Sequence, residues 1–148
     1  MSKIRVDEIV DEAGTGKPDF VNGLKLDGVF EGITTDTTAT GTYTRSVASG
    51  GVYYLTSNQI ANRTIDFTDA NTSLEVDQSV TCSILVTQGS SAYYFNAVEV
   101  DSTAVTPKWS GGSAPTSGNA SGIDVYTFRI IKTADATFTV LASQSQYA

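Results

Sequence analysis

The pattern of apolar and polar positions predicts a chain built mainly of β-strands. Ile65 and Phe67 lie on either side of a polar residue, and Tyr126, Phe128 and Ile130 fall at alternate positions. Alternation of this kind is typical of strands that bury one face. The strands that we expect are residues 43–47, 52–56, 63–68, 79–87, 92–100, 123–132 and 137–142.

Two pairs of these strands flank short connections, residues 88–91 and residues 133–136. Connections of four residues usually join antiparallel neighbours, so we expect two hairpins. In the second hairpin Phe138 and Val140 should meet the apolar face of the preceding strand. Short strands without a long helix predict an all-β fold, an antiparallel β-sandwich of the jelly-roll-like type with an extended N-terminal arm.

The stretch 107–132 looks like the lid and closing strand of this core. Trp109 stands just before a Gly-Gly turn, and Pro115 gives a second turn signal. A loop of small polar residues then leads into the strand at 123–132. Cys82 alternates with apolar residues within the strand at 79–87, so we expect it to be buried.

Composition divides the chain into three parts. Residues 1–28 hold 10 of the 25 formal charges and are interspersed with apolar residues. So short an arm cannot bury these against itself, so we expect it to dock on the core or on another protein; a flexible terminus is the alternative. Residues 29–42 are rich in Thr and predict a linker or an edge strand, and residues 43–148 form the β-sandwich domain. The docking residues of the arm are Ile4, Val6, Ile9, Phe20 and Leu24.

The charge of the chain excludes several classes of function. The net charge is −7, and there is no histidine. The acidic balance argues against binding to nucleic acid or to anionic membranes. The lack of histidine removes the commonest general base and metal ligand, so we expect neither an enzyme nor a cofactor or metal. Ser and Thr make up 37 of 148 residues, which is typical of β-rich extracellular or virion proteins.

Acidic residues near two expected turns do not change this picture. The segment that starts at Asp69 resembles a calcium loop, but Leu74 stands where that loop needs glycine. Asp66 with Asp69, or Glu99 with Asp101, are better explained as turn carboxylates than as the paired acids of a glycosidase.

The N-terminus contains no apolar segment of the signal-peptide kind. No stretch approaches the ~18 apolar residues of a membrane span. We therefore expect a protein that is made in the cytoplasm and does not enter a membrane.

Two motifs lie on either side of a middle part that matches nothing known to us. The first is Ile4-x-Val6-Asp7-x-Ile9 followed by Ala13-Gly14-Thr15-Gly16-x-Pro18-Asp19-Phe20, and the second is Lys108-Trp109-Ser110-Gly111-Gly112-x-x-Pro115 followed by Gly122-Ile123-Asp124-Val125-Tyr126-Thr127-Phe128. The first resembles the N-terminal segments of structural proteins from tailed phages, particularly cyanophage-like ones. The second resembles the β-rich terminal domain of phage tail-fibre and related virion proteins.

The resemblance implies a non-enzymatic virion protein of tail-fibre, adaptor, capsid-decoration or head-fibre type. Such a protein would be made in the host cytoplasm and dock on other virion proteins through its arm. It would present its β domain outward, as a homotrimer.

The aromatic residues support an alternative, a carbohydrate-binding module. Trp109, Tyr93 and Tyr94 could stack against a glycan of the host surface. Adjacent tyrosines on a strand point to opposite faces, so one of the pair is expected to be exposed. The competing interpretation is that these rings belong to the core or to a subunit interface.

Overall fold

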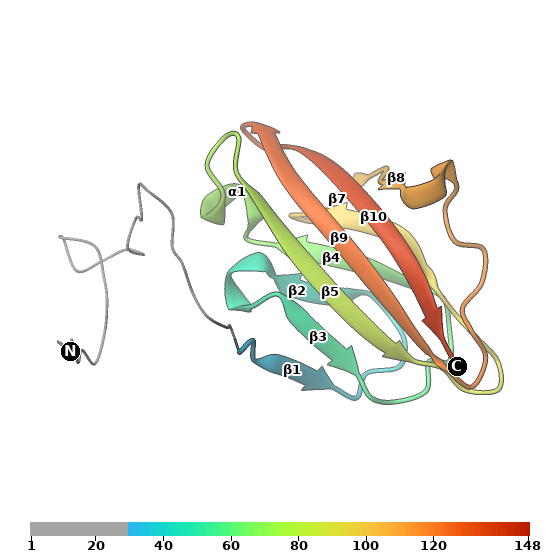
Figure 1. Cartoon of the computed structure of the whole chain (residues 1–148). Coiled ribbons are helices and arrows are strands. Elements are labelled where there is room, and N and C mark those ends of the chain that lie inside the picture. The colour runs from blue at the N-terminus through green and yellow to red at the C-terminus, as the bar shows by residue number, and fades with distance from the viewer. Residues whose placement is uncertain (1–29) are drawn as a thin grey trace, which may run out of the picture. The chain divides into compact units, whose positions relative to one another are not determined.

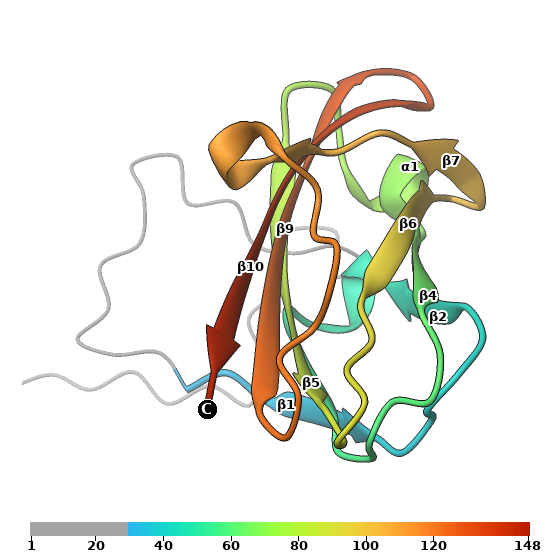
Figure 2. The ribbon, with the colours of Figure 1, turned by 90° about the vertical axis from the view of Figure 1, so that its right-hand side faces the viewer.

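The computed structural model describes residues 30–148, of which Glu31–Ala148 form one compact unit. Figure 1 shows its strands, and Figure 2 shows that they make two layers. Sheet A has the order β1 (Ile33–Asp36), β3 (Val52–Leu55), β5 (Ser79–Thr87), β9 (Ile123–Ala134), β10 (Thr137–Tyr147) and β8 (Lys108–Trp109). Sheet B has the order β2 (Tyr43–Ser46), β4 (Arg63–Thr68), β6 (Phe95–Val100) and β7 (Thr103–Val105).

The first six strands alternate between the two sheets. The chain leaves one sheet, runs back along a single strand of the other sheet, and then returns to the first. Successive strands of the same sheet therefore run in the same direction. In sheet A, β1, β3 and β5 therefore pair in parallel, and in sheet B so do β2, β4 and β6. The strand that lies in the opposite sheet is the crossover connection that parallel neighbours require.

The prediction of a β-rich fold is confirmed, but the antiparallel, jelly-roll-like arrangement is not. Both sheets are mixed: five strand pairings are parallel, and three are antiparallel.

The predicted hairpin across residues 88–91 is wrong. β5 and β6 belong to different sheets, and the chain crosses between the layers from Gln88 to Tyr94. Each of these strands has one apolar face, and the two faces meet across the core instead of lying side by side. A short polar connection has the same sequence pattern whether it joins two strands of one sheet in a hairpin or crosses from one sheet to the other.

The second predicted hairpin is confirmed. β9 and β10 pair antiparallel along their length, and Val140 lies opposite Ile130. Tyr126, Phe128 and Ile130 are fully buried, as their alternation indicates.

One hydrophobic core lies between the two sheets. Phe67 of β4 packs edge-to-face on Phe128 of β9 with ring centroids 5.1 Å apart, and Phe95 of β6 packs in the same way on Tyr126 at 5.0 Å. Cys82 is fully buried within this core, as expected. These aromatic contacts join sheet A to sheet B.

Helical structure is scarce within the described part of the chain. The helix α1 (Ala70–Ser73) has four residues, and short 3₁₀ turns follow β2 (Val47–Ser49) and β8 (Ser110–Gly112). None of the helices among residues 30–148 has the length and apolarity needed to cross a membrane. The expected arm, residues 1–28, lies outside the described residues, and so do its docking residues Ile4, Val6, Ile9, Phe20 and Leu24.

Candidate functional site

A groove with aromatic walls lies at the edge of sheet B that β6 and β7 form. It has a volume of about 400 Å³, and its lining includes Tyr94, Asn96, Pro107, Trp109 and Pro115. These residues come from the β5–β6 crossing, β6, the β7–β8 connection, β8 and the loop after β8. We call this feature the aromatic groove. Its volume falls within the range of small-ligand sites.

Trp109 is held at the groove by strand pairing and by the core. It lies opposite Ala142 in the pairing of β8 with β10. Its indole packs edge-to-face on Phe128 with ring centroids 6.1 Å apart, and the side chain stays partly exposed. One part of the ring is thus fixed on the core while another part lines the groove.

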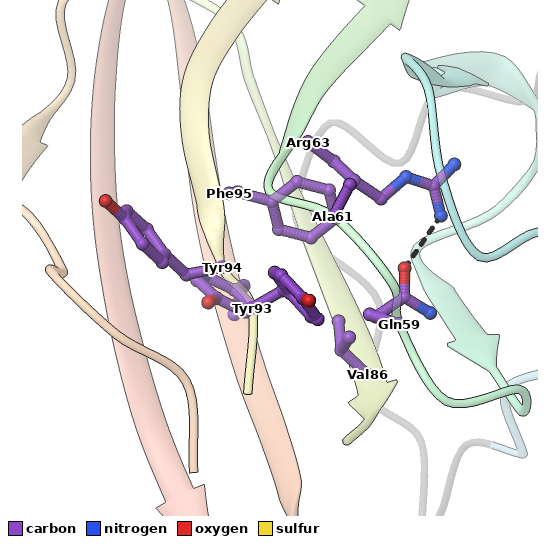
Figure 3. Close-up of a pocket in the computed structure, with 8 residues that line it drawn as sticks. Gln59, Ala61, Arg63, Val86, Tyr93, Tyr94 and Phe95 are labelled. Atoms are coloured by element: carbon purple, nitrogen blue, oxygen red, sulfur yellow. Dashed lines mark hydrogen bonds between the residues drawn. The ribbon is translucent and has the colours of Figure 1, made fainter. Parts of the chain in front are cut away.

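Tyr93 and Tyr94 leave the main chain in different directions (Figure 3). Tyr94 lines the aromatic groove, and both tyrosines line a separate, small cavity with Gln59, Arg63 and Tyr126. That cavity measures about 10 Å³, which leaves room for one water at most. The structure therefore brings together Trp109 and Tyr94, but it does not place Tyr93 in the same groove.

The backbone of the two tyrosines is fixed by polar side chains. The amide of Tyr93 donates to Gln88 Oε1 at 3.0 Å, and Gln88 Nε2 donates back to the Tyr93 carbonyl at 2.7 Å. The Tyr94 amide donates to Asn62 Oδ1 at 3.1 Å, and its carbonyl accepts from the Arg63 amide at 3.1 Å. These hydrogen bonds satisfy the backbone of the segment although it is not part of a strand.

A buried carboxylate supports this clamp. Asp124 of β9 is fully buried and accepts hydrogen bonds from Gln88 Nε2 at 2.9 Å and from the Asn119 amide. Burial raises the pKa of Asp124, and the hydrogen bonds from Asn119 and Gln88 offset part of that rise. Asp124 thereby connects the tyrosine segment to the loop that supplies Pro115.

Gly118 lets the same loop approach the tyrosine segment closely. A Cβ atom at this position would lie 2.4 Å from the Tyr93 carbonyl oxygen and 2.6 Å from Asp124 Oδ2. Any other residue would therefore push the loop away from the opposite wall of the groove.

The lining of the aromatic groove is uncharged. Its polar side chains include Asn96 and Thr106, and the rest include three aromatic residues and two prolines. Aromatic faces with a few amide and hydroxyl groups suit the C–H faces and hydroxyls of a neutral sugar.

Two of the acidic residues considered from the sequence, Asp66 and Asp101, cap turns. Asp101 accepts from the amides of Ala70 at 3.0 Å and Asn71 at 2.8 Å, and so caps the start of α1. Asp66 accepts from the amide and the hydroxyl of Ser102, both at 3.0 Å. Within residues 30–148, no three acidic or cysteine side chains gather as a metal ion would require.

At the other end of α1 a buried lysine completes the capping. Lys132 Nζ donates to the carbonyl oxygens of Asn71 at 2.7 Å and Leu74 at 2.8 Å. An ammonium group near a helix C-terminus satisfies carbonyls that have no partner within the helix.

The buried polar residues were missed by the sequence interpretation, although a signal exists for three of them. Asp124 and Lys132 have the same parity as the apolar residues of β9, and Arg63 has the parity of Ile65 and Phe67. The alternation alone places all three on the inner face. No comparable signal exists for Gln88, which lies in a connection.

Comparisons of the chain with protein-family models, with curated proteins and with solved structures found no match.

Proposed function

We propose that this chain is a non-enzymatic structural component of a tailed-phage virion surface. It docks on capsid or tail proteins through residues 1–28, assembles as a homotrimer and presents its β domain outward. The observation that carries the proposal is the compact unit Glu31–Ala148, which has its own hydrophobic core. A domain of this kind can be presented by a separate docking segment, and the motif in residues 4–24 supplies one.

The test is incorporation of altered chains into particles. Deletion of residues 1–28 should leave the β domain folded but prevent its incorporation into virions. In the full chain, Phe20→Ser with Leu24→Ser should reduce incorporation, because both remove apolar docking surface. Thr15→Ser is the matched control and should be incorporated normally. Normal incorporation of the deleted chain would contradict docking through the arm.

The aromatic groove favours a second candidate function, the binding of a neutral glycan at the host surface. Trp109 and Tyr94, which come from different segments of the chain, line one groove of about 400 Å³. A sugar ring could stack on one of these rings while Asn96 and Thr106 bind its hydroxyls. This function is compatible with the first, because an outward-facing virion domain can also recognise a receptor.

Glycan binding is tested by substitution in the groove. Tyr94→Ala and Trp109→Ala should each weaken binding to glycan arrays by about tenfold or more, since each removes a stacking surface. Trp109→Phe keeps an aromatic ring against Phe128 and should retain part of the binding. Phe30→Ala, at an exposed aromatic side chain that lies outside the groove and in no strand, is the control.

Circular dichroism separates binding from folding. Unchanged spectra together with lost binding would support the groove as the site. If Trp109→Ala unfolds the protein, or if both groove variants bind as the unaltered chain does, Trp109 belongs to the core alone.

A further inference from the structure

The outer face of sheet A forms a broad surface of side chains that point away from the core. It faces the viewer in Figure 1 and forms the outer side of one layer in Figure 2. We call the outward positions of β1, β3, β5, β9 and β10 the sheet-A face. The strand register places them in rows across the sheet, for example Thr35, Tyr54, Leu85, Val125 and Ser145.

The sheet-A face is apolar near the C-terminal ends of β5 and β10. Leu85 lies between Tyr54 and Val125 on the neighbouring strands, and all three are partly exposed. In the next row Ile123 lies between Thr87 and Tyr147, and Tyr147 is 58% exposed. An apolar area that crosses several strands differs from single exposed apolar residues and indicates an interaction surface.

The same face is depleted of charge. Residues 31–148 contain ten of the sixteen acidic residues of the chain, and none of the ten stands at an outward position of these five strands. Arg129 of β9 is the charged residue of the face, and Lys108 of β8 lies at its edge opposite Leu141. The remaining polar positions carry Ser or Thr. Loss of charged residues is what distinguishes the centre of a protein interface from ordinary surface.

The dimensions of the sheet-A face suit a stable contact. β5 pairs with β9 over nine residues, which at ~3.3 Å per residue gives about 30 Å. Five strands at ~4.8 Å give about 24 Å, and the product is roughly 700 Å² as an upper value. Each partner of a standard interface buries about 800 Å², so the face provides most of what such a contact needs.

We propose that a second copy of this chain packs on the sheet-A face. A strongly basic partner would be drawn to the acidic parts of the surface and would gain nothing from an uncharged face. A partner with the same charge of −7 is different, because it can approach closely only where acidic side chains are absent. The inference rests on the proposed homotrimer and assigns its contact surface.

The test places a charge in the apolar part of the face, in the full chain. Analytical ultracentrifugation of the unaltered protein at micromolar concentration should give a multiple of the monomer mass of 15.6 kDa. Leu85→Glu should raise the dissociation constant at least about tenfold, because it buries a charge in the contact. Leu85→Arg should raise it as well. If the positive and the negative charge both weaken association, the cause is loss of the apolar contact and not added negative charge.

Two further variants keep the result interpretable. Ala48→Glu adds the same charge at an exposed position outside both sheets and should leave the dissociation constant unchanged. Leu85→Thr retains strand propensity and should weaken association less than the charged variants. Circular dichroism and thermal unfolding should show that all variants remain folded, since Leu85 is already partly exposed.

The outcomes separate this inference from the proposed function. An oligomer that Leu85→Glu and Leu85→Arg leave intact would overturn the sheet-A face as the contact while the homotrimer stands. A monomer at 100 µM would overturn both the contact and the homotrimer, whereas docking through the arm would be judged by the incorporation test alone.

Discussion

Gly118 offers the sharpest test of how the aromatic groove is built. It lies in the loop between β8 and β9, where the chain passes against the Tyr93 carbonyl. In Gly118→Ala, the new methyl group would lie 2.4 Å from that oxygen, 2.6 Å from Asp124 Oδ2 and 2.9 Å from Gln88 Nε2. The first neighbour is main chain, so it cannot rotate away as a flexible side chain would.

The expected loss of stability follows from these contacts. Insertion of a methyl group into a packed site typically costs about 1–3 kcal/mol. Movement of the loop also lengthens the hydrogen bonds that Asp124 accepts from Gln88 and Asn119, each worth about 1 kcal/mol. We therefore expect Gly118→Ala to lower the free energy of unfolding by roughly 2–3 kcal/mol.

Urea denaturation followed by Trp109 fluorescence is the assay. Gly32→Ala is the matched control, because a Cβ atom there meets nothing within 4 Å. It should change the free energy of unfolding by less than about 0.5 kcal/mol, as is usual for surface substitutions. If Gly118→Ala is no more destabilised than Gly32→Ala, the loop is not held against Tyr93 in the way described.

Three further predictions concern buried groups. Burial raises the pKa of the Cys82 thiol to about 11. A thiol reagent at pH 8 should therefore label the native protein at least about 100-fold more slowly than the denatured protein. Fast labelling of the native protein would show that Cys82 is accessible. Lys132→Met leaves the carbonyls of Asn71 and Leu74 without a donor and should cost about 2–4 kcal/mol in chemical denaturation; a loss below about 1 kcal/mol would contradict the capping of α1. Because the pKa of Asp124 is raised on folding, its contribution to stability is fully present below the unfolded pKa of 3.8 and is lost as the pH rises through the folded pKa. The free energy of unfolding measured from pH 4 to 7 should therefore fall less in Asp124→Asn than in the unaltered chain, and equal slopes would refute this.

Several elements of the fold could be predicted from the sequence because their information is local. The strand at residues 63–68 has the observed bounds of β4, and the hairpin of β9 and β10 follows from two alternating segments around a short turn. Burial of Cys82 and of the aromatic residues of β9 also follows from alternation.

The parallel pairing could not be predicted, because it depends on contacts between distant residues. Tyr43 lies opposite Ile65, and Ile65 lies opposite Val98, with a strand of the other sheet between them each time. Nothing in residues 88–91 distinguishes a hairpin from a crossing between layers. The crossing is fixed by the Gln88 side chain, whose partners are Tyr93 and Asp124.

The candidate site was predictable only in part for the same reason. Exposed aromatic residues in a Ser- and Thr-rich chain suggested stacking, and Trp109 and Tyr94 do line one groove. Alternation predicted that one of the adjacent tyrosines would be exposed, but not which of them would line a groove with Trp109. That depends on how the crossing between the sheets is anchored.

The central claim is the proposal that this chain belongs to a phage virion. Its most direct test is immunogold electron microscopy of intact virions of a phage whose genome carries the gene for this chain. We expect gold label on the particles, because the β domain should face outward and be accessible to antibody. Label on the head would identify a capsid-decoration or head-fibre protein, and label on the tail a fibre or adaptor protein. Purified particles that carry no label, from lysates in which the antibody detects the protein, would contradict the claim that the chain is a component of the virion surface.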